Sequence, residues 1–491
     1  RDAPEFASGH NCSVSWESIN NIATVIRTEW IPETTVTAYS ENGASVFDPL
    51  IREEVFTADR LACASDAEVI DYLSRLPSAY RDWINTQKSR LGTLEDDLLQ
   101  IAENNIDTCD AVCSRIESGI NSLRLDRTLL AAFKLANAAM AIQHGWKSRE
   151  RGKPLSWRPF QLGFILLCAN STCKKDAPDR EIFDLLWFPT GGGKTEAYLA
   201  LVAMLAFYRR GAASEPDLGA GNAALMRYTL RLLTAQQFER ASALILACEL
   251  IRQGRAPKTP YSFPKGNKPI SIGLWVGGDA TPNHFAGERG ALATRGGRDG
   301  TTAEQLSLCP CCHGEVRWDY SDERESVRPY CESVTCALGG AFGLWPVFTV
   351  DDDVYRERPT LLVGTIDKFA MLTTKREVAE LFGFGTTHST DLIIQDELHL
   401  ISGPLGTIAG IYETAFDWLL MKGRCRVKVI GSTATIRRAN EQIRSLFNRE
   451  SCQFPPPGLD YDDSGFTIRD TEKPPRKYLG VTTAGRSAKF A

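Results

Sequence analysis

A glycine-rich segment that ends in a lysine and a threonine has the residue types that bind a polyphosphate. It reads Pro189-Thr190-Gly191-Gly192-Gly193-Lys194-Thr195 and lies between an apolar run and a helical stretch. The backbone N–H groups of such a loop hold phosphate oxygens at the positive end of the helix that follows. We expect Lys194 to pair with the β- and γ-phosphates, and the hydroxyl of Thr195 to ligate Mg²⁺.

A pair of acidic residues could supply hydrolytic chemistry. Asp396-Glu397-Leu398-His399 follows the apolar run DLIIQ at 391–395. Hydrolysis of a nucleotide needs one carboxylate that holds Mg²⁺ and a second group that orients and deprotonates the attacking water. We assign the first role to Asp396 and the second to Glu397, and we count His399 with this catalytic group.

A segment upstream of the glycine loop could recognise the base of ATP. Gln161 ends the string RPFQ, which begins at Arg158. Its amide can both donate and accept a hydrogen bond, as an adenine edge requires. The alternative is a polar helix start. A guanine-specific Asn-Lys-x-Asp motif is absent from the sequence, because Asn267-Lys268 is followed by Pro269-Ile270.

Other predicted strand ends carry hydroxyls, backbone amides or cations that could follow a nucleic-acid backbone without reading its bases. Each is weak alone, and β-branched residues that simply end a strand are the alternative. The two threonines of STAT could also couple hydrolysis to nucleic-acid contact. The candidates are Thr229, Arg231, Gly277, Gly278, Thr365, Lys368, Thr433 and Thr435.

Five of the 14 cysteines fall within 28 residues, and four of them have the spacing of a zinc site. Cys309-x2-Cys312 and Cys331-x4-Cys336 match a four-thiolate zinc ribbon, which would be structural because all four positions are filled by protein. Cys311 is ambiguous, and His313 is a possible substitute ligand. Cys109-x3-Cys113 is better interpreted as one face of a helix.

The elements that must position these residues indicate an α/β fold. From about residue 181, apolar runs alternate with helical stretches, as in a parallel sheet covered on both faces. Ligands of such sheets bind beyond the carboxyl ends of the strands, where the candidate residues lie. The apolar runs are 182–188, 224–230, 270–278, 360–366, 391–395 and 427–435.

The same pattern divides the chain. Residues 1–150 should be mostly helical, residues 151–455 should form the sheet domain with an insertion at 279–355, and a proline-rich linker should follow. The composition (43% hydrophobic, 24% charged, net charge −5) excludes a disordered chain and a globally basic coat protein. No apolar run is long enough to cross a membrane, and no export signal starts the sequence, so we expect a soluble cytoplasmic protein.

These motifs resemble those of superfamily 2 helicases of the DExH-box type. PTGGGKT, DELH, STAT and RPFQ are similar to their nucleotide, acid, coupling and adenine motifs. The longer strings YTLRLLTAQQFER, GTIDKFA, QDELHLISGPLG and STATIRRA resemble the large helicase subunit of the DISARM anti-phage system, the DrmA family. The glycine loop follows the helicase variant, because the first glycine of the general P-loop pattern is replaced by Phe188.

The resemblance implies a RecA-like lobe with ATP, Mg²⁺ and a structural Zn²⁺, in a DNA helicase or translocase subunit of a prokaryotic defence complex. It also implies DNA with a free single-stranded end, and a DUF1998-type partner subunit. The alternative is a nucleotide-gated DNA sensor that does not unwind. A second lobe should carry Q-x-x-G-R-x-G-R, which is missing; Ala484-Gly485-Arg486 is the nearest string. We therefore expect that residues 456–491 hold a linker and the start of a truncated second lobe, and that the fragment hydrolyses ATP poorly.

Overall fold

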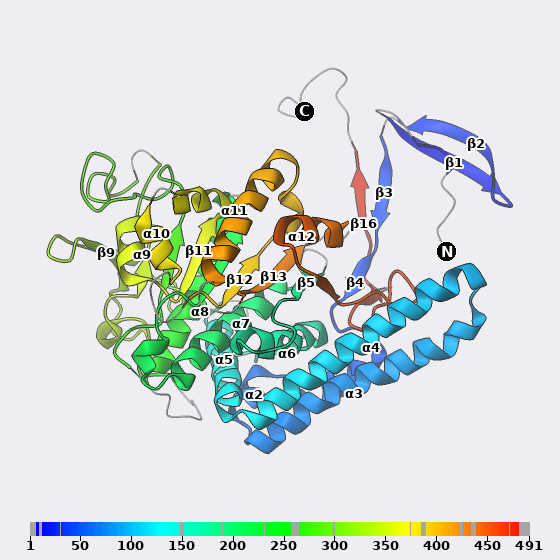
Figure 1. The fold of residues 1–491 in the computed structure, drawn as a ribbon, viewed down its shortest axis with the longest axis horizontal. Coiled ribbons are helices and arrows are strands. Elements are labelled where there is room, and N and C mark those ends of the chain that lie inside the picture. The colour runs from blue at the N-terminus through cyan, green and yellow to red at the C-terminus, as the bar shows by residue number, and fades with distance from the viewer. Residues whose placement is uncertain are drawn as a thin grey trace. The chain divides into compact units, whose positions relative to one another are not determined.

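Eight strands form one sheet at the centre of the larger part of the chain (Figure 1). Their order is β10-β7-β11-β6-β12-β13-β5-β14, and each pair of neighbours is parallel. The predicted parallel sheet is therefore confirmed. The strands are β5 (Phe183–Trp187), β6 (Ala224–Tyr228), β7 (Ile272–Trp275), β10 (Val347–Phe348), β11 (Leu361–Thr365), β12 (Leu392–Gln395), β13 (Lys428–Thr433) and β14 (Ser451–Phe454).

Helices cover both faces of this sheet, because crossovers between parallel strands are right-handed. α7 and α8 lead from β5 through β6 to β7, whereas α11 and α12 lead in the opposite direction across the sheet and lie on its other face (Figure 1). The central strands β11, β6, β12, β13 and β5 are almost entirely buried as a result, whereas the edge strand β14 is partly buried. The helices of the sheet domain are α6 (Pro159–Cys173), α7 (Lys194–Ala212), α8 (Arg231–Arg252), α9 (Asp351–Glu357), α10 (Arg376–Leu381), α11 (Gly403–Met421) and α12 (Ala439–Phe447).

The N-terminal helices pack on the same body. They are α1 (Asp48–Arg52), α2 (Ala58–Cys63), α3 (Asp66–Arg90), α4 (Asp96–Leu125) and α5 (Arg127–Trp146), of which α3 and α4 form a long hairpin (Figure 1). Arg115 of α4 bonds both carboxylate oxygens of the fully buried Asp184 on β5, at 2.7 and 2.9 Å. Lys428 of β13 reaches the same carboxylate at 2.7 Å. This buried charge group ties α4 to the sheet.

The predicted insertion leaves the sheet after β7 and returns at β10. It carries an antiparallel hairpin of β8 (Val316–Ser321) and β9 (Ser326–Cys331). β10 is only two residues long, which is too short for a periodicity signal, and the return at Val347 precedes the predicted boundary at 355.

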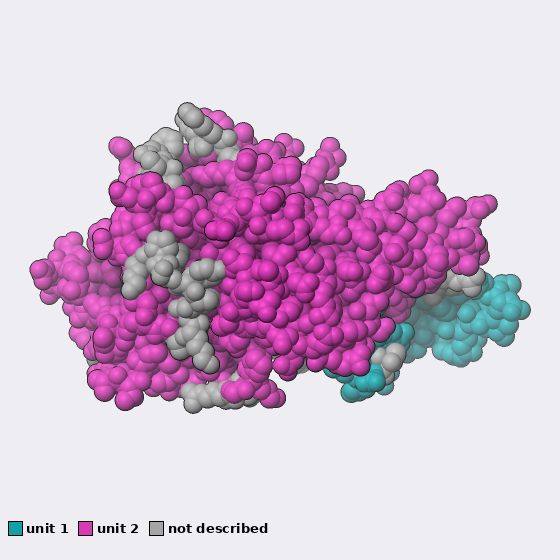
Figure 2. All heavy atoms as spheres, turned by 90° about the horizontal axis from the view of Figure 1, so that it is seen from below, with its two compact units in different colours: residues 1–40, 467–491 teal, residues 41–466 magenta. Residues whose placement is uncertain are grey.

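A second, smaller unit comprises residues 1–40 and 467–491, and residues 41–466 form the larger one (Figure 2). The small unit contains the hairpin of β1 (Ser13–Ile19) and β2 (Ile22–Glu29). β3 (Glu33–Val36) pairs antiparallel with β16 (Arg476–Leu479), and β4 (Ala38–Ser40) with β15 (Ile468–Asp470). Residues 468–470 and 476–479, which were expected to lie near the start of a second lobe, thus pair with N-terminal strands. Residues 456–466 belong to the larger unit.

The computed structural model describes residues 6–8, 12–29, 31–147, 152–188, 191–229, 231–256, 266–297, 300–373, 375–383, 389–421, 426–433, 438–470 and 472–480. Within these ranges, every helix is too short or too polar to span a bilayer.

Candidate nucleotide site and cysteine cluster

A cavity of about 550 Å³ lies at the carboxyl edge of the sheet, beyond β5, β12 and β13. Parallel sheets bind their ligands at this edge. Of the residues predicted to bind a nucleotide and to hydrolyse it, all except His399 line the cavity together: Arg158, Gln161, Gly191, Gly192, Gly193, Lys194, Thr195, Asp396 and Glu397.

The glycine loop has the backbone conformation that its sequence requires. Gly191 and Gly193 have φ values of 88° and 85°, in the left-handed region that favours glycine. α7 begins directly after, at Lys194, so its free N–H groups face the cavity. The ammonium of Lys194 donates to the carbonyl oxygen of Phe188 at 2.6 Å. Burial lowers the pKa of Lys194, although Glu397 and Asp396 oppose the shift.

One hydroxyl joins the two residues expected to hold Mg²⁺. Tyr198 Oη donates to Oδ2 of Asp396 at 2.8 Å and lies 3.1 Å from Oγ1 of Thr195. Burial, and then Asp396, raise the pKa of Tyr198 far above its ordinary value, so the hydroxyl keeps its proton. Two oxygen ligands within reach of one atom suit Mg²⁺, which prefers oxygen donors. The residues present therefore fit this metal.

The second acidic residue lies beside the first. Glu397 has a left-handed backbone, with φ of 48°, and its N–H donates to Oδ1 of Asp396 at 3.0 Å. Burial, and then the charge of Asp396, raise the pKa of Glu397, while Lys194 and His399 lower it. His399 Nδ1 lies 3.4 Å from Oε2 of Glu397 and 3.0 Å from Oγ1 of Thr433. His399 thus connects the acidic pair to the end of β13.

Gln161 and Arg158 contact the glycine loop. The amide of Gln161 donates to the carbonyl oxygen of Gly193 at 2.8 Å and accepts from the backbone N–H of Arg158 at 3.0 Å. Arg158 donates to the carbonyl oxygen of Gly192 and pairs with Glu41. Both side chains therefore support the loop in this structure.

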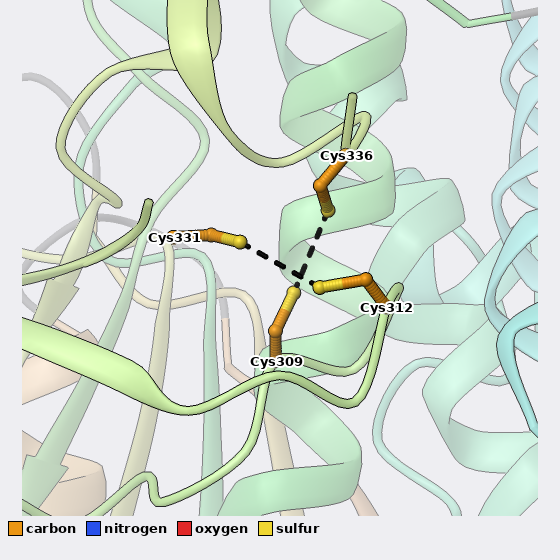
Figure 3. Close-up of side chains that lie close together, drawn as sticks. All are labelled: Cys309, Cys312, Cys331 and Cys336. Atoms are coloured by element: carbon orange, nitrogen blue, oxygen red, sulfur yellow. Dashed lines mark hydrogen bonds between the residues drawn. The ribbon is translucent and has the colours of Figure 1, made fainter. Parts of the chain in front are cut away.

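The four predicted cysteine ligands converge, as Figure 3 shows. The sulfur atoms of Cys309, Cys312, Cys331 and Cys336 all lie within 4.8 Å of one another, with two pairs at 3.7 and 3.6 Å. Four thiolates on tetrahedral zinc, at about 2.3 Å from the metal, would be about 3.8 Å apart. The cluster could therefore hold zinc.

The sequence did not decide whether two further residues, Cys311 and His313, are ligands of the cluster. Cys311 lies outside the group of four sulfurs. His313 is also outside it, because its Nε2 donates to the carbonyl oxygen of Trp146 at 2.8 Å. Cys109 and Cys113 are buried on one face of α4, which confirms their interpretation as helix packing residues.

Comparison with known proteins gives one long match. The chain is 34% identical to the DISARM protein DrmA of Bacillus paralicheniformis, in an alignment of 567 residues that covers 100% of the chain. The chain is a homologue of DrmA over its whole length. The resemblance predicted from the motif strings is thereby confirmed. The chain spans about half of the length of this curated relative, 49%.

The remaining comparisons concern family models and solved structures. No family model matches the chain. The DUF1998 helicase MrfA matches with a TM-score of 0.35 and 12% identity, covering 64% of this chain and 32% of MrfA. Mss116p, solved with ssRNA and AMP-PNP, matches with a TM-score of 0.35 and 14% identity, covering 66% and 43%. The DrmA homologue thus combines an eight-stranded parallel sheet, a glycine loop and an acidic strand end at the carboxyl edge of that sheet with a cysteine-bearing insertion and N-terminal helices.

The residues predicted to contact nucleic acid differ in their exposure and in their hydrogen-bond partners. The hydroxyls of Thr229 and Thr365 are buried and have no hydrogen-bond partner among the described residues. Lys368 is only 7% exposed, because it pairs with Asp351 at 2.5 Å. Thr433 is bonded to His399. Gly277 and Gly278 follow β7 and Arg231 begins α8, but the side chain of Arg231 and the whole of Thr435 lie outside the described residues.

Sequence reasoning missed several residues of the cavity. Tyr198 is the most important, and its position three residues after Thr195 on a predicted helix could have indicated it, because residues i and i+3 share a face. Glu196, Arg240 and Gln237 also line the cavity. α8 brings the last two there from a distant part of the sequence, and no local pattern marks them.

Proposed function

We propose that this chain binds Mg²⁺ and ATP in the cavity and hydrolyses the ATP in order to engage DNA, as a helicase-type subunit of a DISARM-like anti-phage defence complex. The observation that carries the proposal is the contact of Tyr198 with both Thr195 and Asp396. This contact joins the hydroxyl of Thr195 to the carboxylate of Asp396, directly after β12, and both residues line the cavity together with Lys194.

Each residue of the cavity has a role in this reaction. Mg²⁺, when bound by Thr195 and Asp396, would neutralise phosphate charge. Lys194 would exchange the carbonyl of Phe188 for phosphate oxygens, and the N–H groups that begin α7 would hold the same oxygens. Glu397 would take the proton of the attacking water, and its raised pKa makes it a better base near neutral pH.

Contact between His399 and Thr433 supports a link between hydrolysis and nucleic acid. A change in the protonation or position of Glu397 during turnover would affect His399, which lies 3.4 Å away, and through it Thr433, which lies 3.0 Å from His399. At this edge of the sheet, Thr365 ends β11, whereas Thr229 follows β6 and the Gly277–Gly278 turn follows β7. We assign the contact with DNA to this edge of the sheet. The DNA would bind through a single-stranded end. The partner of the chain would be a DUF1998-type subunit.

The cysteine cluster has a separate role in the proposal. Four thiolates that fill a tetrahedral site leave no open position for chemistry, so zinc would hold the β8–β9 hairpin together.

Phosphate release from ATP tests the enzymatic part. The complete protein should hydrolyse ATP with Mg²⁺, and single-stranded DNA should stimulate this hydrolysis. Lys194→Ala should lose ATP binding, whereas Glu397→Gln should keep binding and lose turnover by about 10²–10⁴-fold. Normal turnover by Glu397→Gln would refute the assigned base. Strand displacement by the complete protein would test the helicase activity itself.

A further inference from the structure

Two hydrogen-bond acceptors in the nucleotide cavity have no donor. Oε2 of Glu196 and Oε1 of Gln237 are both buried, and no group of the described residues donates to either atom. Both side chains line the cavity. A buried acceptor without a donor destabilises the protein, so such atoms indicate a missing ligand group.

Glu196 and Gln237 are held on the same side of the cavity. Glu196 follows Thr195 in the first turn of α7, and its other oxygen, Oε1, accepts from Arg240 of α8. Gln237 lies three residues before Arg240, on the same face of that helix. The salt bridge of Arg240 therefore brings Gln237 to the side of the cavity where Glu196 lies.

Polar side chains crowd the glycine loop beside Glu196. A methyl group at Gly193 would lie 3.2 Å from Oε2 of Glu196, 2.7 Å from Nε2 of Gln161 and 2.9 Å from Nη1 of Arg158, so only glycine fits at this position. Glu196 directly follows the phosphate-binding residues, so a group of the nucleotide that donates to Oε2 from the cavity would come from the part beyond the phosphates.

The side chain of Gln161 cannot bind the nucleotide base unless it first breaks its present hydrogen bonds. Its amide oxygen and nitrogen are both bonded to the backbone, at Arg158 and Gly193. Recognition of a base by Gln161 would break these two hydrogen bonds, whereas recognition by Glu196 and Gln237 breaks none.

The charge of Glu196 is balanced locally, which makes it compatible with a triphosphate ligand. Arg240 bonds to it, and the ammonium of Lys147 lies 3.9 Å from Oε1. A carboxylate held between these two cations is a hydrogen-bond acceptor, which binds donors.

We infer that Glu196 and Gln237 accept hydrogen bonds from the nucleoside part of the nucleotide, with the 6-amino group of adenine as the donor, and so select ATP over 6-oxo purine nucleotides. The inference rests on the proposed function, because it places a nucleoside triphosphate in the cavity. Ribose hydroxyls are the other donors of the same ligand, and the test separates them from the base.

Calorimetry tests the inference by measuring the affinity of the protein for four probes. The probes are ATP, ITP, 2′-deoxy-ATP and inorganic tripolyphosphate. ITP replaces the 6-amino group by oxygen, 2′-deoxy-ATP lacks one ribose hydroxyl, and tripolyphosphate lacks the nucleoside. The wild-type protein should bind ATP about tenfold more tightly than ITP, as expected for hydrogen bonds to a charged acceptor.

Glu196→Ala should weaken ATP about tenfold or more and should remove the preference over ITP. It should not weaken tripolyphosphate, because removal of a negative charge favours an anion. Gln237→Ala, which keeps the salt bridge of Glu196, should show the same pattern to a smaller extent. Glu239→Ala, an exposed residue of α8 outside the cavity lining, is the matched control and should change nothing.

If Glu196→Ala instead removed the preference for ATP over 2′-deoxy-ATP, Glu196 would still be an acceptor, and its donor would be a ribose hydroxyl. Equal weakening of ATP and tripolyphosphate by Glu196→Ala, or unchanged discrimination in both variants, would overturn the inference. Failure of the wild-type protein to bind either ATP or tripolyphosphate would instead overturn the proposed function.

Discussion

The hydroxyl of Tyr198 donates a hydrogen bond to Oδ2 of Asp396 over 2.8 Å, and this bond joins the first turns of α7 to the end of β12. The same hydroxyl lies 3.1 Å from Thr195. Two segments almost 200 residues apart in the sequence are therefore held together by one hydroxyl.

Removal of that hydroxyl should loosen the metal site. Tyr198→Phe keeps the buried ring but leaves Asp396 without its donor, so the Mg²⁺-dependent affinity for ATP should fall about tenfold, together with a loss of about 1 kcal/mol in the free energy of unfolding. Titration calorimetry and urea denaturation measure the two effects. Affinity equal to that of the wild-type protein would show that Tyr198 does not position Asp396.

The raised pKa of Glu397 predicts a pH-dependent effect on stability. Burial and Asp396 favour the protonated form, so the folded protein keeps this proton at pH values above the ordinary 4.5, where the unfolded chain has lost it. The stability contributed by the group is complete below pH 4.5 and is lost as the pH rises through the folded pKa. Glu397→Gln cannot ionise and avoids this loss.

The melting temperature of Glu397→Gln should therefore exceed that of the wild-type protein at pH 8, by on the order of 1 °C. The difference should disappear near pH 4. A lower melting temperature of the variant at pH 8 would contradict the assigned environment of Glu397.

Lys368 was predicted to contact nucleic acid, but it forms a buried ion pair. Its partner Asp351 is 1% exposed and lies on α9, directly after the cysteine-bearing insertion. Lys368→Met would leave a buried carboxylate unpaired and should cost about 3–5 kcal/mol of unfolding free energy. The second change Asp351→Leu should recover most of this loss.

The exposed pair of Arg376 and Glu380 provides a control for this experiment. Arg376→Ala should cost less than about 0.5 kcal/mol, because surface pairs contribute little. If the stable double variant at 368 and 351 also lost affinity for single-stranded DNA, Lys368 would have a contact role in addition to the ion pair.

The cysteine cluster should make part of the fold metal-dependent. A chelator or Cys336→Ser should release one equivalent of zinc and should lower the melting temperature, because the thiolates would repel one another or lose their shared ligand. Metal analysis and thermal unfolding measure both effects, and Cys311→Ser, outside the cluster, is the matched control. Full metal content in Cys336→Ser would contradict the assigned ligand set.

The sequence predicted the features that depend on local pattern. Apolar runs indicated the parallel sheet, the spacing of four cysteines indicated their cluster, and the glycine loop and Asp396 indicated the edge where they meet. The features it missed depend on distant partners. β16 pairs with β3 across more than 400 residues, and neither short strand has a periodicity that could reveal the pairing.

Single residues were misjudged for the same reason. The sequence around Lys368 shows a cation after a strand, and only the return of the insertion brings Asp351 to it. The sequence analysis did not single out Tyr198, because its position three residues after Thr195 indicates a shared helix face but not the bond to the distant Asp396.

The central claim is that the glycine loop and the acidic strand end bind one metal–nucleotide complex together. The most direct measurement is the affinity for ATP with and without Mg²⁺, in the wild-type protein and in Asp396→Asn. Mg²⁺ should strengthen ATP binding at least about tenfold in the wild-type protein, through the ligands Thr195 and Asp396, and should have little effect in the variant. The same dependence on Mg²⁺ in both proteins, or none in the wild-type protein, would contradict this account.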